Sequence, residues 1–116
     1  MYKVDGTKIY LTRGDTFYCT IGMTKNDEPY IPEQGDSIRF VLKHAEMTAG
    51  NTAYKDYKPL LEKSIPTDTL LLKLEAEDTK KFKFGKYVYD IEITFANGDV
   101  YTFINNSEFN LIPEVD

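Results

Sequence analysis

The clearest pattern along the chain is an alternation of apolar and polar residues between positions 87 and 95. Polar residues separate most members of the apolar series Tyr87, Tyr89, Ile91, Ile93 and Phe95. Successive side chains of a β-strand leave opposite faces, so this period of two predicts a half-buried strand. Asn97-Gly98 follows and favours a two-residue hairpin turn. Residues 100–104 are β-branched and aromatic, which is typical of a returning strand.

A two-residue loop would fix the register of this hairpin. It places Phe95 opposite Val100, and the pairs Ile93–Thr102 and Ile91–Ile104 follow from it. Tyr101 and Phe103 then lie on the outer face, which also carries Asp90 and Glu92. A slip of one residue, from a three-residue loop, would instead turn both aromatic residues toward the core.

Exposed aromatic residues on a sheet are either covered or available to a partner. In the register of the two-residue loop, we expect Tyr101 and Phe103 to be partner-binding residues. Leu71 is a further apolar candidate on an outward position. Such a patch predicts weak self-association or contact with a neighbouring protein.

Short apolar runs bounded by turn residues predict the remaining strands. They cover residues 8–12, 16–24, 37–43, 59–65, 69–75 and 108–113, with an extended edge segment at 29–32. Residues 76–82 predict one short helical turn, with Asp78 or Thr79 as its cap. Seven or eight strands at this spacing predict an all-β, immunoglobulin-like antiparallel sandwich. Its predicted core is Phe17, Cys19, Ile21, Ile38, Phe40, Leu42, Leu70, Leu72, Leu74, Tyr89, Ile91, Ile93 and Phe95.

The segment before the main strand is similar to the E–F corner of immunoglobulin-like sandwiches. In that corner a tyrosine hydroxyl binds backbone a few residues upstream. Here Tyr87 is the corresponding residue, and we expect its hydroxyl to reach backbone near Asp78 or Lys80. Tyr89 stands where a disulfide-bonded immunoglobulin domain has its second cysteine.

Residues 44–58 show no clear period and predict a long loop within the single domain formed by residues 1–116. Two interpretations stay open for this loop. It is either a mobile connection or a contact loop that presents Tyr54 and Tyr57 to a partner.

Composition narrows the classes of partner. The 116 residues are 41% hydrophobic and 14% aromatic, which favours a β-rich globular domain over disorder. A net charge of −5 disfavours binding to nucleic acid. No apolar run is long enough for a membrane span, and a single cysteine excludes an intramolecular disulfide. We therefore expect folding in a reducing cytoplasm, without membrane or nucleic-acid partners.

The residue inventory offers little catalytic chemistry. Cys19 is predicted to face the core, and His44 is the only histidine, so a Cys–His pair is disfavoured. One cysteine and one histidine cannot complete a zinc site. Asp90 and Glu92 share one face of a strand, which suits acid–base catalysis in principle and a solvated polar face equally well. We expect no enzyme activity, cofactor or metal.

An ordered set of turn-and-strand motifs carries a resemblance to a known family. The motifs are Arg13-Gly14-Asp15-Thr16-Phe17, Pro29-Tyr30, Ser37-Ile38-Arg39-Phe40, Glu77-Asp78-Thr79, residues 84–91 and residues 97–103. In this order they resemble the small β-sandwich proteins of tailed phages and prophages of Gram-positive bacteria, related to the N-terminal domain of the baseplate upper protein.

The resemblance implies a non-catalytic virion structural or assembly role, of tail or baseplate type. It implies other phage structural proteins as partners, and a location first in the host cytoplasm and then in the virion. The alternative is a carbohydrate- or surface-binding module, because tyrosine rings can stack on sugars. Tryptophan, which stacks most strongly, is absent from the sequence.

Overall fold

Strands make up most of the structure, a computed structural model that describes residues 2–44 and 59–113. This confirms the predicted all-β class. The predicted loop, with Tyr54 and Tyr57, lies almost wholly outside the described residues. The elements are β1 (Tyr2–Asp5), β2 (Lys8–Thr12), β3 (Phe17–Thr20), β4 (Thr24–Lys25), β5 (Glu28–Pro29), β6 (Ser37–His44), β7 (Leu61–Ile65), β8 (Leu71–Leu74), α1 (Ala76–Lys80), β9 (Gly85–Thr94) and β10 (Val100–Ile112).

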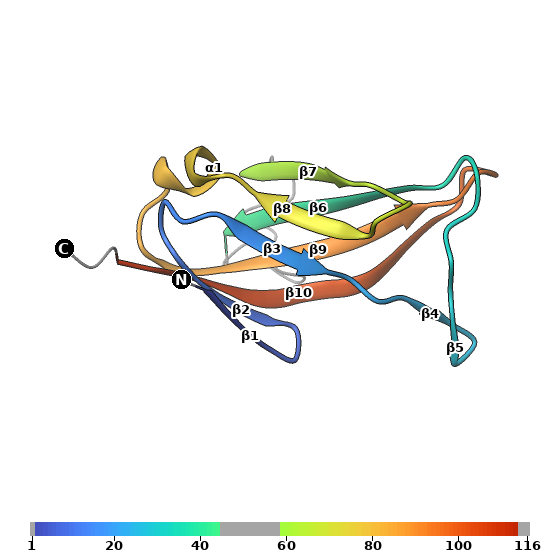
Figure 1. The fold of residues 1–116 in the computed structure, drawn as a ribbon, viewed down its shortest axis with the longest axis horizontal. Coiled ribbons are helices and arrows are strands. Elements are labelled where there is room, and N and C mark those ends of the chain that lie inside the picture. The colour runs from blue at the N-terminus through green and yellow to red at the C-terminus, as the bar shows by residue number, and fades with distance from the viewer. Residues whose placement is uncertain (1, 45–58, 114–116) are drawn as a thin grey trace, which may run out of the picture.

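The strands form two layers (Figure 1). The larger layer is a six-stranded sheet in the order β1-β2-β10-β9-β6-β7, and the smaller is the pair β3-β8. The short hairpin β4-β5 projects at one end of the molecule.

One pairing contradicts the predicted antiparallel sandwich, because β2 and β10 run parallel, with Ile9 opposite Phe109 and Leu11 opposite Leu111. A hairpin can join only antiparallel neighbours. Here the two partners come from opposite ends of the described chain, so no hairpin constrains their direction. The parallel pairing places all four of these apolar side chains in the core.

The predicted strands at 100–104 and 108–113 are one continuous strand, β10. Its pairing with β9 shifts between Thr102 and Ile104, and again between Ile104 and Ser107. Asn106 adopts a left-handed conformation with φ of 51° in the second irregularity. Bulges absorb the extra residues without ending the strand. The polar residues 105–108 therefore mark a bend in β10 and not a loop.

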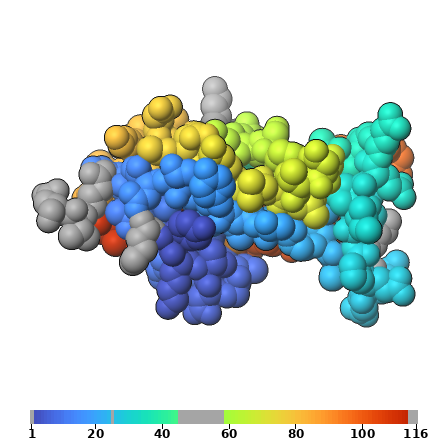
Figure 2. Space-filling view, in the orientation of Figure 1, coloured from blue at the N-terminus to red at the C-terminus, as the bar shows by residue number. Residues whose placement is uncertain are grey.

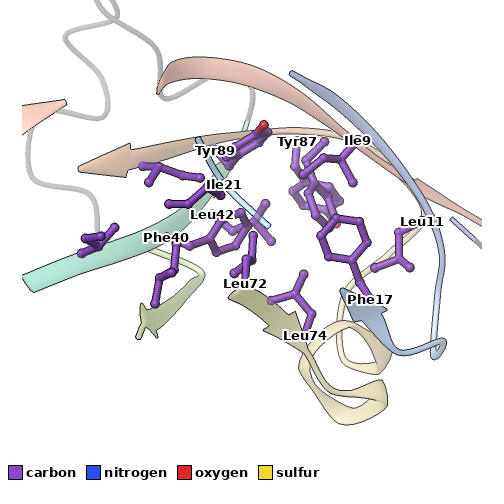
Figure 3. Close-up of a cluster of buried hydrophobic side chains, with 14 of the residues drawn as sticks. Ile9, Leu11, Phe17, Ile21, Phe40, Leu42, Leu72, Leu74, Tyr87 and Tyr89 are labelled. Carbon is purple, nitrogen blue, oxygen red and sulfur yellow. The ribbon is translucent and has the colours of Figure 1, made fainter. Parts of the chain in front are cut away.

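The core lies between the two layers (Figure 3). Of the thirteen predicted core residues, ten are buried, while Cys19, Leu70 and Phe95 are half-buried against the cluster. The prediction missed the buried residues near both ends of the described chain and three residues between them. The additional members are Ile9, Leu11, Met23, Ile65, Tyr87, Phe109 and Leu111.

The corner before β9 forms as predicted in outline. The predicted cap, Asp78 or Thr79, is wrong, because both residues lie inside α1 and its N-cap is Glu75. Asp78 Oδ2 accepts a hydrogen bond from the backbone N–H of Glu75 at 2.7 Å. Thr79 is fully buried, and its Oγ1 accepts from Gly14 N at 3.0 Å. Tyr87 donates its hydroxyl to the carbonyl of Lys83 at 2.7 Å. The predicted return to upstream backbone is confirmed, and the predicted acceptors near Asp78 or Lys80 are wrong.

Candidate functional site

The turn between β9 and β10 sets the geometry of the site. Phe95 N donates to Asp99 O, and Gly98 N donates to Phe95 O, both at 2.8 Å. Gly98 has φ of 96°. This is a three-residue loop that ends in a glycine bulge, the second common way for an Asn-Gly pair to close a hairpin.

The longer loop shifts the register by one residue relative to the prediction. Tyr101 lies opposite Ile93, and Thr102 lies opposite Glu92. Residues directly opposite each other in an antiparallel pair share a face. Tyr101 therefore belongs to the inner face with Ile93, and its predicted place beside Asp90 and Glu92 is wrong. The alternative register, which turns the aromatic residues inward, is the one that forms.

Burial of the two aromatic residues differs. Phe103 is half-buried and packs against the core cluster, whereas Tyr101 keeps 55% of its surface exposed. The inner face of the large sheet therefore extends beyond the β3-β8 layer at this end of the molecule, and the ring of Tyr101 is left uncovered there.

An apolar pocket of about 260 Å³, which we call the aromatic pocket, opens at this end of the molecule. The β4-β5 region forms one wall, and the ends of β9 and β10 form the other. The lining residues are Met23, Thr24, Asn26, Tyr30, Ile93, Phe95, Tyr101 and Phe103. Tyr101 and Phe103, predicted as partner-binding residues, thus meet in one pocket. No pattern in the sequence indicated the opposite wall of the pocket.

Tyr30 fixes that opposite wall. Its ring packs edge-on against Phe95 at 5.7 Å, and its hydroxyl donates to Asp36 Oδ2 at 2.6 Å. The other oxygen of Asp36 accepts from Ala96 N at 3.1 Å. The hydrogen bond to Asp36, followed by burial, raises the pKa of Tyr30 to about 12. Asp36 therefore ties the β5 side of the pocket to the β9–β10 turn.

The edge of β10 beside this pocket is open among the residues that the structure describes. On that side β2 pairs only with the segment Phe109 to Ile112. No described strand continues this pairing alongside Val100 to Ile104. The β1-β2 and β4-β5 hairpins stand out on either side of a recess (Figure 2). An unpaired strand edge is a template for binding another chain.

A second apolar hollow, of about 230 Å³, lies between the β1-β2 hairpin and the two layers. It is lined by Val4, Gly6, Thr7, Ile9, Cys19, Thr20, Ile21, Gly22, Leu72, Tyr89, Ile91 and Ile104. Burial raises the pKa of the Cys19 thiol, which donates weakly to Thr20 O at 3.6 Å. The thiol is therefore protonated at neutral pH and serves as packing.

The outer face of the large sheet carries ion pairs. Lys43 is buried, and its Nζ donates to Asp90 Oδ2 at 2.8 Å and to Asn106 Oδ1 at 2.6 Å. Asp90 Oδ1 accepts from Asn106 N at 2.7 Å. Glu92 accepts from Arg39 Nε at 2.6 Å. Asp90 is thus paired with Lys43, and Glu92 is paired with Arg39, which also contacts Glu62. The alternation in β6 gave no sign that Lys43 would be buried.

The other sequence candidates lie elsewhere. Leu71 is half-buried in β8 opposite Thr20 and does not line the aromatic pocket. Tyr54 and Tyr57 are outside the described residues. Within residues 2–44 and 59–113, no group of three or more His, Cys, Asp or Glu side chains could hold a metal ion. The same residues include no helix long and apolar enough to cross a membrane.

Comparisons of the chain with protein-family models, curated proteins and solved structures find no match. The pocket and the open edge of β10 are the features with an evident capacity for binding. A pocket of this kind accepts an apolar side chain, with Thr24 and Asn26 as polar groups at its margin.

Proposed function

We propose that the chain is a non-catalytic virion structural or assembly protein of a tailed phage or prophage, of tail or baseplate type, which binds another phage structural protein. The observation that carries the docking role is the aromatic pocket with its exposed Tyr101. The phage context comes from the resemblance of the ordered motifs.

The binding free energy that this pocket can supply is small, as expected for one contact within a larger assembly. Covering the exposed ring of Tyr101 with a partner side chain contributes about 1.5–3 kcal/mol of apolar transfer. The entropy lost on association opposes this gain. One pocket therefore supports weak binding, which becomes effective where many copies are held close together.

We also propose that the sandwich is immunoglobulin-like. The order β10-β9-β6-β7 follows the G, F, C and C′ strands of a variable-type domain, and the β3-β8 pair takes the place of B and E. The hydroxyl of Tyr87 on Lys83 O matches the tyrosine corner. The parallel β2–β10 pair is compatible with this arrangement, since β2 is added at the free side of the G strand.

The non-catalytic assignment is supported by where the reactive side chains lie. Cys19 pairs with Leu72 in the smaller layer, and His44 pairs with Tyr87 at the end of β6 in the larger one. Asp90 and Glu92 are engaged by Lys43 and Arg39. Nucleophilic and acid–base catalysis both need such groups to converge on one substrate.

Incorporation into particles tests the proposed function. Particles purified from the strain that encodes the chain should contain it in fixed proportion to known tail proteins. Tyr101→Ser should remain folded, because the ring is exposed, and should be depleted from particles. A matched change outside the pocket, Leu71→Ser, should be incorporated normally. Absence of the protein from particles, or normal incorporation of Tyr101→Ser, would contradict the proposal.

A carbohydrate-binding role is the second candidate. Two tyrosine rings and the polar side chains Thr24 and Asn26 line the same pocket, and such rings can stack on sugars. Glycan-array binding that is lost with Tyr30→Ala and Tyr101→Ala would favour this role over protein docking.

A further inference from the structure

We propose that the first half of β10 binds an extended segment of a partner protein as an added β-strand. This inference rests on the proposed docking function and names the mode of binding. The added strand would lie on the β2 side of β10, next to the half of β10 that β2 does not reach, because β2 begins at Lys8 and pairs with β10 only from Phe109 onward. Four features of the described residues support it.

Backbone direction is the first feature. Phe95 N donates to Asp99 O across the hairpin, so this pair is hydrogen-bonded. Antiparallel ladders alternate bonded and non-bonded pairs along the strands. Val100, opposite Thr94, and Thr102, opposite Glu92, therefore direct their N–H and C=O groups away from β9. These groups form the hydrogen-bonding row that an added strand needs.

The shape of the recess is the second feature. The edge from Val100 to Ile104 is roughly 17 Å long at the usual rise of a strand. The β1-β2 and β4-β5 hairpins project on either side of it (Figures 1 and 2). A single extended chain fits between two hairpins. In a second copy the same two hairpins project beside the β10 edge, and they oppose edge-to-edge pairing of two copies.

Side-chain pockets are the third feature. An added strand directs alternate side chains to the inner face, where Tyr101 lies opposite Ile93. The aromatic pocket of about 260 Å³ opens beside Tyr101 and Phe103, and the hollow of about 230 Å³ reaches Ile104. The partner segment should therefore carry apolar residues at alternate positions, so that one side chain enters the aromatic pocket and another enters the second hollow.

Charge is the fourth feature and restricts the partner further. Asp27 and Glu28 directly follow the pocket residue Asn26, Asp99 comes two residues before the pocket residue Tyr101, and all three carboxylates are exposed, so negative charge lies at the aromatic-pocket end of the edge. A partner segment with Lys or Arg beside its apolar residues is favoured at that end, and an acidic segment is repelled.

Proline substitution at the edge separates strand addition from simple pocket binding. Thr102 is exposed, and its N–H points away from β9, so Thr102→Pro removes an edge donor and leaves the ladder to β9 intact. Thr102→Ala keeps the N–H and is the matched control. Unchanged circular dichroism and unfolding midpoint establish that both variants are folded.

The probe is a synthetic peptide in which Val and Phe alternate with Thr, with Lys at both ends. Its controls are a shuffled peptide of the same composition and a peptide with Glu at both ends. We expect binding of the alternating, Lys-ended peptide to fall about five- to tenfold in Thr102→Pro, from the loss of one backbone hydrogen bond. Binding to Thr102→Ala should change less than about twofold. Amide exchange at Val100 and Thr102 should slow when the peptide binds.

Three results would overturn the inference. Equal binding to Thr102→Pro and Thr102→Ala would exclude strand addition, and if Tyr101→Ser still weakened binding, pocket docking would stand without it. Equal binding of the shuffled peptide would exclude recognition of alternate side chains. No binding of any peptide to the native protein would remove the inference, while particle incorporation would still decide the proposed function independently.

Discussion

The two halves of β10 belong to one strand and have opposite surroundings. From Phe109 to Leu111 the strand is paired on both sides, with β9 and with β2, and Phe109 and Leu111 are buried. From Val100 to Ile104 it is paired with β9 alone among the described residues, and Tyr101 is 55% exposed. Both halves are rich in apolar residues, so residue type alone does not separate a stabilising segment from a binding segment.

The two halves of β10 differ because the neighbouring strand, β2, lies beside only one of them. β2 begins at Lys8, so its pairing with β10 starts at Ile9 and Phe109, and the chain before it turns back into β1. The first half of β10 also directs apolar side chains to the inner face, and no strand of the described residues pairs with its other edge. The length of β2 therefore decides which half of β10 contributes to stability and which half is open for binding.

The largest expected effect comes from truncating a ring in the doubly paired half. Phe109 is fully buried, so Phe109→Ala should lower the free energy of unfolding by about 3–5 kcal/mol through lost transfer energy and a cavity. Tyr101→Ala in the open half should cost no more than about 1 kcal/mol. Equilibrium urea denaturation of both variants measures the difference. Similar losses at the two positions would erase the contrast between the halves.

A smaller effect is expected where the halves join. Asn106, in the irregular part of β10, binds both Asp90 and the buried Lys43. Lys43→Met should lower the free energy of unfolding by about 2–3 kcal/mol, because it leaves a half-buried carboxylate without its cation. Arg39→Met is the control, since its pair with Glu92 is more exposed and should contribute less than about 1 kcal/mol. Equal effects in thermal unfolding would mean that the junction is not held by this network.

The corner hydroxyl beside the doubly paired half should matter less. Tyr87 lies opposite Phe109 and donates to Lys83 O at 2.7 Å. Tyr87→Phe should cost about 0.5–1.5 kcal/mol, the usual net contribution of one such bond. Chemical denaturation provides the measurement. A neutral result would show that the hydroxyl does not stabilise the turn after α1.

The smallest effect concerns pH and the wall of the open pocket. The pKa of Tyr30 is raised to about 12 in the folded protein, from an ordinary value near 10. Its hydrogen bond to Asp36 therefore contributes fully below about pH 10, and the contribution is lost as the pH rises toward 12. The native protein should lose stability more steeply over this range than Tyr30→Phe. Parallel curves for the two proteins would indicate that Tyr30 is not held by Asp36 as a protonated phenol.

Sequence patterns predicted the parts of the fold that depend on local alternation. The core positions of β6 and β9, including Phe40 and Ile91, follow from period two alone. The register at Tyr101 could not be derived in this way, because Asn-Gly closes both two-residue and three-residue loops. Only the backbone around Phe95 and Gly98 decides between them.

Contacts between segments that are far apart along the chain could not be predicted from the sequence pattern. The parallel β2–β10 pair brings Ile9 to Phe109, and the pocket brings Tyr30 to Tyr101. The burial of Lys43 depends on Asp90 and Asn106, far away along the chain. The sequence pattern therefore predicted only one wall of the candidate site, the wall formed by the β9-β10 hairpin.

Native-state amide hydrogen exchange of the isolated protein tests the contrast within β10 most directly. The amides from Phe109 to Leu111, and the amide of Tyr101 that faces β9, should be protected. The amides of Val100 and Thr102 should exchange roughly a hundredfold faster or more, because no strand within residues 2–44 and 59–113 pairs with their edge. Protection of Val100 and Thr102 equal to that of Tyr101 in the free protein would show that the edge is already occupied, and would contradict the account.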